Sequence, residues 1–440
     1  MNSEWTLGKL SDIADIIMGQ SPSGEMCSNE KIGLPLLNGP TEFGSHHPTP
    51  VQFTTDPRKI AQENDILFCV RGSTTGRMNW ADQQYAIGRG IAAIRHKNSS
   101  QYRHFVKGVL KFKLPTLLAS ATGSTFPNVS KDQLSNVEFI IPPLDEQKAI
   151  AHILGTLDDK IELNQQMNHT LEAIARALFQ SWFINFDPVR AKMDGRQPAG
   201  MDAETAALFP DEFEDSALGK IPKGWEVSSL GKLFPKDNNC VITGPFGSNL
   251  HAHDYRSEGV PLILVKHINN GRIQEEGLPL VGKHKLPDLN RYRLEIGDII
   301  FSRVGAVGRT AYIYPRYAGC LISGQTLRVR VSQTKILNSR YLAQIYLEPS
   351  FIKMVEGHAL GTTRLSLNTK LLQSFQFIVP PIAVQNKFVQ LINSFDLQIQ
   401  ANLSETKLLI HIRDPLLPKL LSGQVQALNK SFEKIIENKR

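Results

Sequence analysis

The chain has 440 residues, of which 41% are hydrophobic and 21% charged, and its formal net charge at pH 7 is +7. At ~150 residues per typical domain, this length predicts at least two globular bodies, and the composition excludes a largely disordered protein. No apolar stretch reaches the ~18 residues that a membrane span needs, and the first residues do not form a secretory signal. Four scattered cysteines without a C-x-x-C pair exclude a zinc ribbon or a disulfide framework and favour a cytoplasmic protein.

The sequence repeats itself once, and this internal duplication is its most informative feature. Five segments recur in the same order: Trp5–Leu10 as Trp225–Leu230, Gly33–Leu36 as Gly259–Leu262, Asp65–Phe68 as Asp298–Phe301, Gly123–Thr125 as Gly361–Thr363, and Phe139–Pro143 as Phe377–Pro381. Chance can supply one such match, but five matches in one order indicate two copies of the same unit. The duplication therefore predicts module 1 (residues 1–144) and module 2 (residues 219–382).

Each module is predicted to contain short strands that end at glycine-rich turns. Runs of β-branched and aromatic residues bounded by glycine are typical of such strands. Four segments fit this pattern: Asp65–Phe68, Ile91–Ile94, Asp298–Phe301 and Leu327–Val331. A pair of prolines then ends each module, because proline cannot donate to a sheet and disfavours helix in the residue before it.

The segment after each proline pair is predicted to be a long helix with a coiled-coil seam, because apolar residues alternate at spacings of three and four. The first seam comprises Leu154, Leu157, Ile161, Asn164, Asn168, Leu171, Ala175, Leu178 and Trp182, and the second comprises Ile392, Phe395, Ile399, Asn402, Thr406, Leu409 and Arg413. Pro415 is expected to end the second helix. Asn164 and Asn402 are equivalent, and we expect their amides to pair with each other. An amphipathic helix packed on its own module is the alternative.

These two helices are predicted to pack antiparallel and to hold the modules apart. About 35 residues at ~1.5 Å each make a helix of ~50 Å. Two modules on such a spacer could meet DNA about one helical turn apart, which is ~34–36 Å. The pattern thus predicts recognition of a split sequence with an unread gap.

Charge is distributed unevenly along the chain. Residues 145–218 contain 6 basic and 14 acidic residues, whereas residues 219–382 contain 21 basic and 11 acidic residues, and 11 of those 21 cations are arginine. Arginine favours phosphate and guanine recognition because its planar fork donates hydrogen bonds in pairs. The basic segment indicates nucleic-acid binding, and the acidic stretch Asp202–Asp215 is expected to face away from the duplex or toward a partner.

No catalytic set is found in the sequence. The phosphate-cradling loop of ATPases is absent, and Ile141–Leu144 and Val379–Ile382 lack the polar and aromatic residues that adenine methyltransferases place around a proline pair. The histidines at 46, 47, 251 and 253 have no third and fourth ligand nearby, so they are interpreted as loop residues that meet solvent or phosphate. Asp158 and Asp159 are interpreted as a solvated helix face. We expect no cofactor, no metal and no enzymatic activity in this chain.

Several motifs together resemble the specificity subunit of type I restriction-modification enzymes, over essentially the whole chain. They are the tryptophan openings at Trp5 and Trp225, the Pro-Pro-x3-Gln helix starts at Gln147 and Gln385, the central segment Leu178–Arg190 and the segment Leu218–Trp225. The sequence departs from this family at Pro415 and Pro418, which are expected to shorten the second helix.

The resemblance implies an α+β fold with two similar target-recognition domains, joined by two long antiparallel helices in a pseudo-twofold repeat. The expected segments are 1–144 and 219–382 for recognition, and 145–218 and 383–440 for the helical regions. Each recognition domain would read one half of a bipartite, gapped site in double-stranded DNA. Two modification subunits that bind S-adenosylmethionine would dock on the helices, and restriction subunits that use ATP and magnesium would join that core. The alternatives are a free-standing DNA-binding protein and a methyltransferase with an atypical site.

Base contacts follow from no family motif, so we assign candidates from physical chemistry. Glycine turns let the backbone approach phosphate, and arginine or hydroxyl groups beside them can read base edges or hold the backbone. The candidate contacts are Arg71, Ser73, Thr74, Arg77, Arg89, Thr125 and Asn128 in module 1, and Lys266, His267, Asn269, Arg303, Arg309, Thr363 and Arg364 in module 2. Arg364 is the strongest candidate, and for each residue a salt bridge or a solvated side chain is the alternative.

Overall fold

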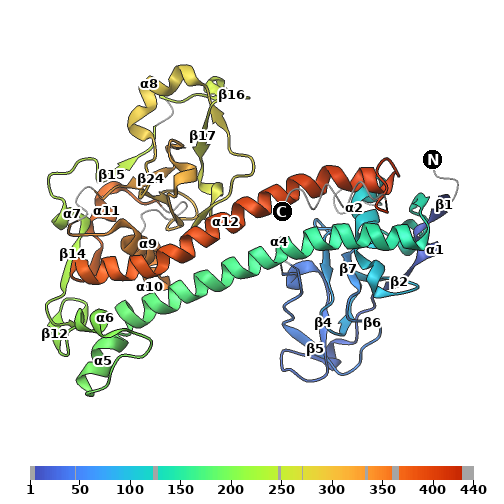
Figure 1. Ribbon diagram of the computed structural model, residues 1–440, viewed down its shortest axis with the longest axis horizontal. Helices are drawn as coiled ribbons and strands as arrows, with labels where there is room; N and C mark the ends of the chain where they lie inside the picture. Colours follow the sequence, from blue (N-terminus) through green and yellow to red (C-terminus); the bar gives the residue numbers. More distant parts are fainter. Residues whose placement is uncertain are drawn as a thin grey trace. The chain divides into compact units, whose positions relative to one another are not determined.

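The computed structural model describes residues 5–44, 46–121, 127–245, 249–269, 271–331, 335–358 and 366–428. The chain divides into two compact units. Unit 1 comprises Met1–Asn168 and Ile399–Arg440, and unit 2 comprises His169–Gln398. Each unit contains one module and a part of each long helix, α4 (Leu144–Phe179) and α12 (Ile382–Leu421) (Figure 1). The division into four segments stays a prediction, because the compact units cut both helices.

Module 1 is built on two small sheets. The first has the strand order β2 (Ala14–Met18), β10 (Ile91–His96), β7 (Ile66–Cys69) and β8 (Met78–Trp80). The second has the order β3 (Cys27–Ser28), β5 (Gln52–Thr54), β4 (Leu34–Leu37), β9 (Tyr85–Ile87) and β6 (Ile60–Ala61). A separate pair joins β1 (Thr6–Lys9) to β11 (Glu138–Ile141). Only β4 and β9 pair in parallel among the named strands of module 1.

Module 2 repeats the strand order of the first sheet and of four strands of the second, and the described part of the chain has no strand there as a counterpart of β6. Its first sheet has the order β15 (Val241–Thr243), β24 (Thr326–Val329), β21 (Ile299–Ser302) and β22 (Thr310–Tyr312). Its second sheet has the order β16 (Tyr255–Arg256), β20 (Leu280–Val281), β17 (Val260–Ile263) and β23 (Leu321–Ile322), and β17 pairs with β23 in parallel. Two further pairs join β14 (Glu226–Ser229) to β25 (Gln376–Val379) and β18 (Ile268–Asn269) to β19 (Arg272–Ile273). The predicted duplication of an α+β module is confirmed.

Shorter helices complete both units. In unit 1 they are α1 (Leu10–Ile13), α2 (Arg103–Ala119) and α3 (Lys131–Ser135). In unit 2 they are α5 (Asp187–Met193), α6 (Ala203–Ala207), α7 (Leu230–Leu233), α8 (Leu286–Leu289), α9 (Ser339–Leu347), α10 (Pro349–His358) and α11 (Thr369–Ser374), with the hairpin of β12 (Phe213–Ser216) and β13 (Gly219–Pro222). Figure 1 shows α9, α10 and α11 gathered beside the start of α12.

The aspartate before each central strand is explained by a buried ion pair. Asp65 is 2% exposed and accepts a hydrogen bond from Arg95 at 2.7 Å, and Asp298 is 1% exposed and accepts one from Arg330 at 2.7 Å. Each carboxylate also accepts from the backbone N–H three residues earlier. The pair joins two neighbouring strands of the first sheet in each module, so this duplicated motif has a structural role.

The helix seam lies where its spacing predicts, but its asparagines pair differently. All seam residues named from the sequence are buried or half-buried. Within unit 1 the Asn402 amide donates to Asn168 Oδ1 at 2.9 Å, whereas the Asn164 amide donates to Glu405 Oε2 at 2.8 Å and lies 3.5 Å from the Thr406 hydroxyl. The predicted pairing of Asn164 with Asn402 is therefore wrong.

Antiparallel packing is the physical reason for this difference. Two equivalent residues of an antiparallel helix pair face each other only at the pseudo-twofold axis, and Asn164 and Asn402 lie away from it on opposite sides. The symmetric contacts are instead Asn164 with Thr406 and Asn168 with Asn402. A threonine therefore stands where full symmetry would place a second asparagine pair.

In unit 2 the end of α4 forms an aromatic core. Phe179, Trp182 and Phe183 surround the Phe388 ring of α12 at centroid distances of 5.7, 5.9 and 5.1 Å. The helix turn Gln180–Ile184 is a π turn, and Phe186 then leaves the helix with φ 56°. These rings fill the core of module 2. The central motif Leu178–Arg190 therefore anchors α4, and its aromatic side chains are buried in the core.

The helix α12 continues through Pro415 and Pro418 to Leu421, so the expectation that Pro415 ends it is wrong. A proline in a helix interior costs about 3 kcal/mol relative to alanine. Leu417, Leu420 and Leu421 follow and are buried in the core of module 1. Burial of one such side chain is worth about 1.5–3 kcal/mol, so tertiary packing offsets the weakened backbone bonding.

Candidate nucleic-acid interface

In module 1 the glycine turn between β7 and β8 is joined to the loop that precedes α3. Gly72 and Gly76 have φ of 94° and 91°, a region that favours glycine, so the turn can fold back tightly. The Thr75 hydroxyl lies 2.8 Å from the carbonyl oxygens of Gly72 and Pro127, which connects the turn to the loop. Two segments that sequence analysis proposed for DNA contact are therefore brought together.

Module 2 has the same arrangement. Gly305 and Gly308 have φ of 81° and 89° in the turn between β21 and β22. The backbone N–H of Leu367 donates to the Arg303 carbonyl at 2.8 Å, and Val304 forms a β-bridge with Ser366. The glycine turn of each module is thus paired with the loop that follows its sheet.

The module 1 candidates differ in what their side chains contact, and the Thr74 hydroxyl lies 3.7 Å from Cys69 Sγ. Arg71, Ser73, Thr74 and Arg89 are exposed, and Arg71 forms a β-bridge with Asn128, so these groups cluster at the turn and its neighbouring loop. Thr125 lies outside the described residues.

Arg77 has a different environment from the other candidates of module 1. Its guanidinium donates to the Phe43 carbonyl at 2.7 Å and to the carbonyls of Pro40 and Gly44 at 3.2 Å. Those bonds hold the loop at 40–44 against the turn, so Arg77 has a structural role in this conformation.

The module 2 candidates also differ in exposure. Lys266, Asn269 and Arg309 are exposed, and the Arg303 guanidinium lies 3.4 Å from the Gly324 carbonyl. His267 is only 2% exposed, its Nδ1 accepts from the Leu264 N–H at 3.2 Å, and burial lowers its pKa. The His267 ring is therefore turned into module 2 in this conformation, and its contact with DNA stays a prediction. Thr363 and Arg364 lie outside the described residues.

A cavity of about 800 Å³ opens between the glycine turn of module 2 and the ends of β17 and β23. Lys266 and Arg309 line it, together with Ser323 and Gln325, which sequence analysis did not propose. Apolar walls are supplied by Pro245, Leu250, Tyr255, Leu262, Leu264, Val265, Val304 and Ala306. The internal repeat could have indicated Ser323 and Gln325. They follow β23, the counterpart of β9, and each of these strands pairs in parallel within its module.

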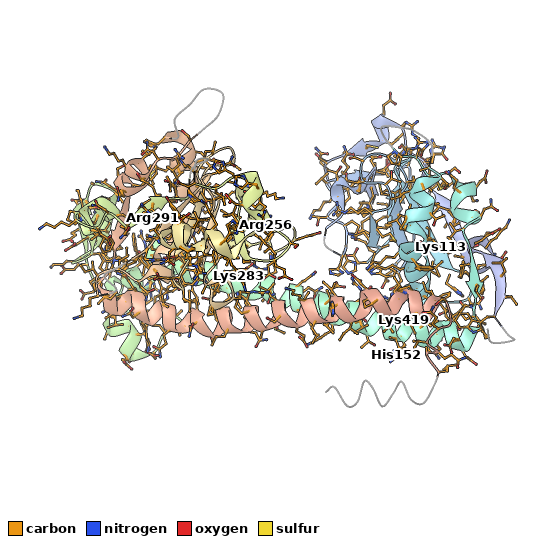
Figure 2. The ribbon with its side chains drawn as sticks, turned by 90° about the horizontal axis from the view of Figure 1, so that it is seen from above. Lys113, His152, Arg256, Lys283, Arg291 and Lys419 are labelled. Carbon is orange, nitrogen blue, oxygen red and sulfur yellow. The ribbon has the colours of Figure 1, made fainter. Side chains whose placement is uncertain are left out.

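Additional cations lie on the same module, outside any predicted motif. Arg256, Lys283 and Arg291 are exposed on the segments around β16 and α8 (Figure 2). They add to the positive charge of module 2, which favours association with a polyanion at moderate salt. In unit 1, Lys113 lies on α2 and Lys419 on α12 (Figure 2).

The histidines of module 1 dock the module onto α4. His46 Nδ1 lies 3.2 Å from Glu162 Oε2, and His47 Nε2 lies 3.4 Å from Glu162 Oε1. His46 and His47 therefore both contact a helix carboxylate, and the His47 side chain stays 39% exposed. Over the part of the chain that the structure describes, no three His, Cys, Asp or Glu side chains are grouped as a metal site.

Asp158 is likewise engaged, so its interpretation as part of a solvated face is wrong. Its carboxylate accepts from Lys107 of α2 at 3.2 Å and from Arg413 of α12 at 2.8 Å. Burial alone would raise the pKa of Asp158, but Lys107 and Arg413 lower it on balance. The ionised carboxylate fastens both helices together in unit 1.

Each long helix also presents apolar side chains to solvent, away from the seam. Leu163 and Ile174 of α4 are 50% and 43% exposed, and Leu397 and Leu408 of α12 are 65% and 57% exposed. These four side chains therefore remain in contact with water in this chain. Within the ranges described above, no helix combines the length and apolarity that crossing a membrane requires.

Comparison with known proteins identifies relatives over most of the chain. Residues 2–173 and 222–408 match the family described as "Type I restriction modification DNA specificity domain". The specificity subunit of the type I restriction enzyme HindI from Haemophilus influenzae is 29% identical over 417 residues, covering 84% of this chain and 88% of the relative. The MjaIX specificity subunit from Methanocaldococcus jannaschii is 25% identical over 444 residues, covering 96% and 94%. Among solved structures, the S subunit of a type I restriction-modification system from M. genitalium has a TM-score of 0.60 at 18% identity, covering 96% of this chain and 97% of that one.

Proposed function

This chain belongs to the type I restriction-modification DNA specificity family, and from that premise we propose that it selects the DNA target for a modification complex. Each module would read one half of a bipartite, gapped site in double-stranded DNA. The duplicated module is the main support for this proposal. In module 1 the glycine turn bonds to Pro127, and in module 2 it bridges to Ser366 at the equivalent place. The residues that we favour as DNA contacts are the exposed ones: Arg71, Ser73, Thr74 and Arg89 of module 1, and Lys266, Asn269 and Arg309 of module 2.

We further propose that modification subunits dock on the exposed apolar side chains of α4 and α12. Two such subunits are expected, because the two helices are related by the internal repeat. Leu163 of α4 and Leu408 of α12 represent the exposed apolar side chains of the two helices, and docking would remove both from water. Catalysis, with S-adenosylmethionine, would take place on these partners, and restriction subunits with ATP and magnesium would join the same core. The four cysteines are free, in keeping with the cytoplasm as the place of assembly.

The decisive experiment is co-expression of this chain with the modification subunit of its host, followed by purification and mapping of methylated adenines in the DNA. We expect a stable complex that methylates one split sequence with a constant gap. A free-standing DNA-binding protein is the alternative. Site-specific binding by a chain that never associates with the modification subunit would establish that alternative.

A pair of variants tests the docking surfaces separately. Leu163→Glu combined with Leu408→Glu is expected to abolish co-purification of the modification subunit, because a charge cannot be buried without a partner. Leu218 is 48% exposed outside the two helices, so Leu218→Glu is the matched control and should leave the complex intact. Equal behaviour of the two variants would contradict docking on these helices.

A further inference from the structure

The strongest unassigned feature is the cavity of module 2, which lies where the parallel strands β17 and β23 end. Its polar lining comes from Lys266, Arg309, Ser323 and Gln325. Ser323 is 6% exposed, and its hydroxyl has no hydrogen-bond partner among the described residues. A buried polar group without a partner is costly, so its presence at a cavity wall points to a ligand group that completes it.

The backbone of Gln325 is held by a hydrogen bond, whereas its side chain makes none to the described residues. Its carbonyl accepts from the Arg303 N–H at 2.9 Å, which joins it to the glycine turn. Its side chain is exposed, and its amide forms no hydrogen bond to any residue in the described ranges. Lys266 and Arg309 flank the same cavity with exposed side chains. The lining of the cavity therefore combines two cations with an amide that can both donate and accept.

Module 1 has the same backbone bonds at the equivalent place. The Val70 N–H donates to the Gly90 carbonyl at 2.9 Å, as Arg303 does to Gln325, and the Gly88 N–H donates to the Leu37 carbonyl at 2.8 Å, as Ser323 does to Ile263. Gly88 and Gly90 are thus the counterparts of Ser323 and Gln325. The two modules share a backbone frame at this place but differ in every side chain that it presents.

Module 1 cannot accept the module 2 side chains without rearrangement. A Cβ atom at Gly88 would lie 2.4 Å from Asn38 Oδ1, and one at Gly90 would lie 2.4 Å from the Asn38 carbonyl oxygen. Asn38 and Arg89 are the exposed polar residues there, and the Asn38 amide donates to Gln52 at 3.0 Å. One common backbone frame that presents different side chains is what two readers of different half-sites require.

We propose that Gln325 is a specificity-determining residue of module 2 and reads the edge of an adenine in the major groove. A glutamine amide can donate to adenine N7 and accept from the N6 amino group at once, which no other base edge permits in the same way. Lys266 and Arg309 hold the adjacent phosphates, and the Ser323 hydroxyl faces the same cavity. This inference rests on the proposed function of the chain as the DNA-selecting subunit.

The test compares Gln325→Ala with Gln376→Ala, both in complex with the modification subunits. Gln376 is exposed on β25 of the same unit and is not among the residues that line the cavity, so it is the matched control. Binding to duplexes that contain the methylated site is measured against random duplexes at several salt concentrations. We expect Gln325→Ala to weaken specific binding about 10-fold to 100-fold, and to leave random binding and the salt dependence unchanged because the amide carries no charge.

The methylation pattern supplies a second readout. Gln325→Ala should relax one A·T position within one half-site while the other half-site and the gap stay the same. Lys266→Ala should weaken specific and random binding equally and reduce the salt slope by about one unit. Unchanged discrimination by Gln325→Ala overturns the inference but leaves the proposed function standing. Failure of the unaltered complex to bind or methylate any split site overturns the proposed function itself.

Discussion

At the scale of single residues, buried polar side chains fasten each module to the start of its helix. Gln147 and Gln385 are 2% and 0% exposed and donate to the carbonyls of Pro142 and Pro380 at 2.8 and 2.7 Å. Gln147 Oε1 accepts from His96 Nε2 at 3.1 Å, because His96 Nδ1 already accepts from a backbone N–H. The duplicated Pro-Pro-x3-Gln motif is therefore a buried link between module and helix.

Replacement of Gln385 by leucine is expected to lower the free energy of unfolding by about 2–3 kcal/mol, because three backbone partners lose their hydrogen bonds to a buried side chain. Those partners are the Asn338 N–H and the carbonyls of Ile336 and Pro380. Urea unfolding measures the effect. Gln390→Leu, at an exposed position of the same helix, should change stability little. Equal losses in the two variants would contradict the proposed link.

His104 is expected to make unit 1 sensitive to acid. Burial, with a smaller contribution from the charge of Arg103, lowers the pKa of His104 to about 4, and its side chain is 9% exposed. The folded state therefore favours the neutral ring, so its contribution to stability is complete above the unfolded pKa of about 6.5 and is lost as the pH falls toward 4. The full difference corresponds to roughly 3 kcal/mol.

The measurement is urea unfolding of the wild type and His104→Phe at pH 7 and pH 5. Phenylalanine keeps the packing against the Trp80 ring, whose centroid lies 5.0 Å away, and removes the titrating group. The wild type should lose more stability at pH 5 than the variant does. His96, whose pKa is also lowered by burial, leaves some acid sensitivity in both proteins. His152→Phe, at an exposed position of α4, should behave like the wild type.

At the scale of elements, the antiparallel helix pair combines apolar seam residues with a few buried amides. The Asn168 and Asn402 side chains are 2% and 3% exposed, and the Asn402 amide donates to Asn168 Oδ1 inside the seam. Buried amides at seam positions restrict helix register at a cost in stability. This pair is therefore expected to select the antiparallel register observed in unit 1.

A double-mutant cycle tests this role. Asn402→Leu alone should lower the free energy of unfolding by about 1–3 kcal/mol, because Asn168 keeps a buried amide without its partner. Asn168→Leu combined with Asn402→Leu should recover that loss or exceed the wild type, since an apolar pair fits an apolar seam. Urea unfolding gives the four free energies. Additive losses in the double variant would show that the two amides act independently.

At the scale of the whole molecule, the two compact units differ in how the chain builds them. Unit 2 is one continuous segment, whereas unit 1 needs residues from both ends of the chain. Leu420 of α12 is fully buried in the core of module 1, and a Cβ atom on Gly423 would lie 3.3 Å from the Trp5 ring. Module 1 is therefore completed by the end of the second helix.

Separate fragments should reflect this difference. A fragment of residues 169–398 is expected to unfold cooperatively by itself, whereas residues 1–168 should do so only when residues 399–440 are co-expressed. Leu420→Ala in the second fragment should weaken that association, because deleting a buried leucine costs about 2–5 kcal/mol. Leu408→Ala, at a side chain that is 57% exposed, is the control. Cooperative unfolding of residues 1–168 alone would contradict this account.

The sequence by itself determined the repeat, the two modules and the seam, because each leaves a local or periodic trace. The spacing of three and four placed Leu154, Ile161 and Ile392 in the seam, and all three are buried. The family resemblance and the DNA-selecting role followed from motifs such as Gln147 and Gln385.

Only the tertiary structure decided which polar groups meet. The pairing of Asn168 with Asn402 depends on the antiparallel axis, and the engagement of Arg77 and burial of His267 depend on segments distant in the chain. Pro415 and Pro418 of α12 show the same effect of tertiary contacts. The low helix propensity of proline is outweighed by burial of the neighbouring leucines in the core of module 1. Local propensity acts over a few residues, whereas burial and hydrogen bonding are settled by neighbours that the folded chain brings together.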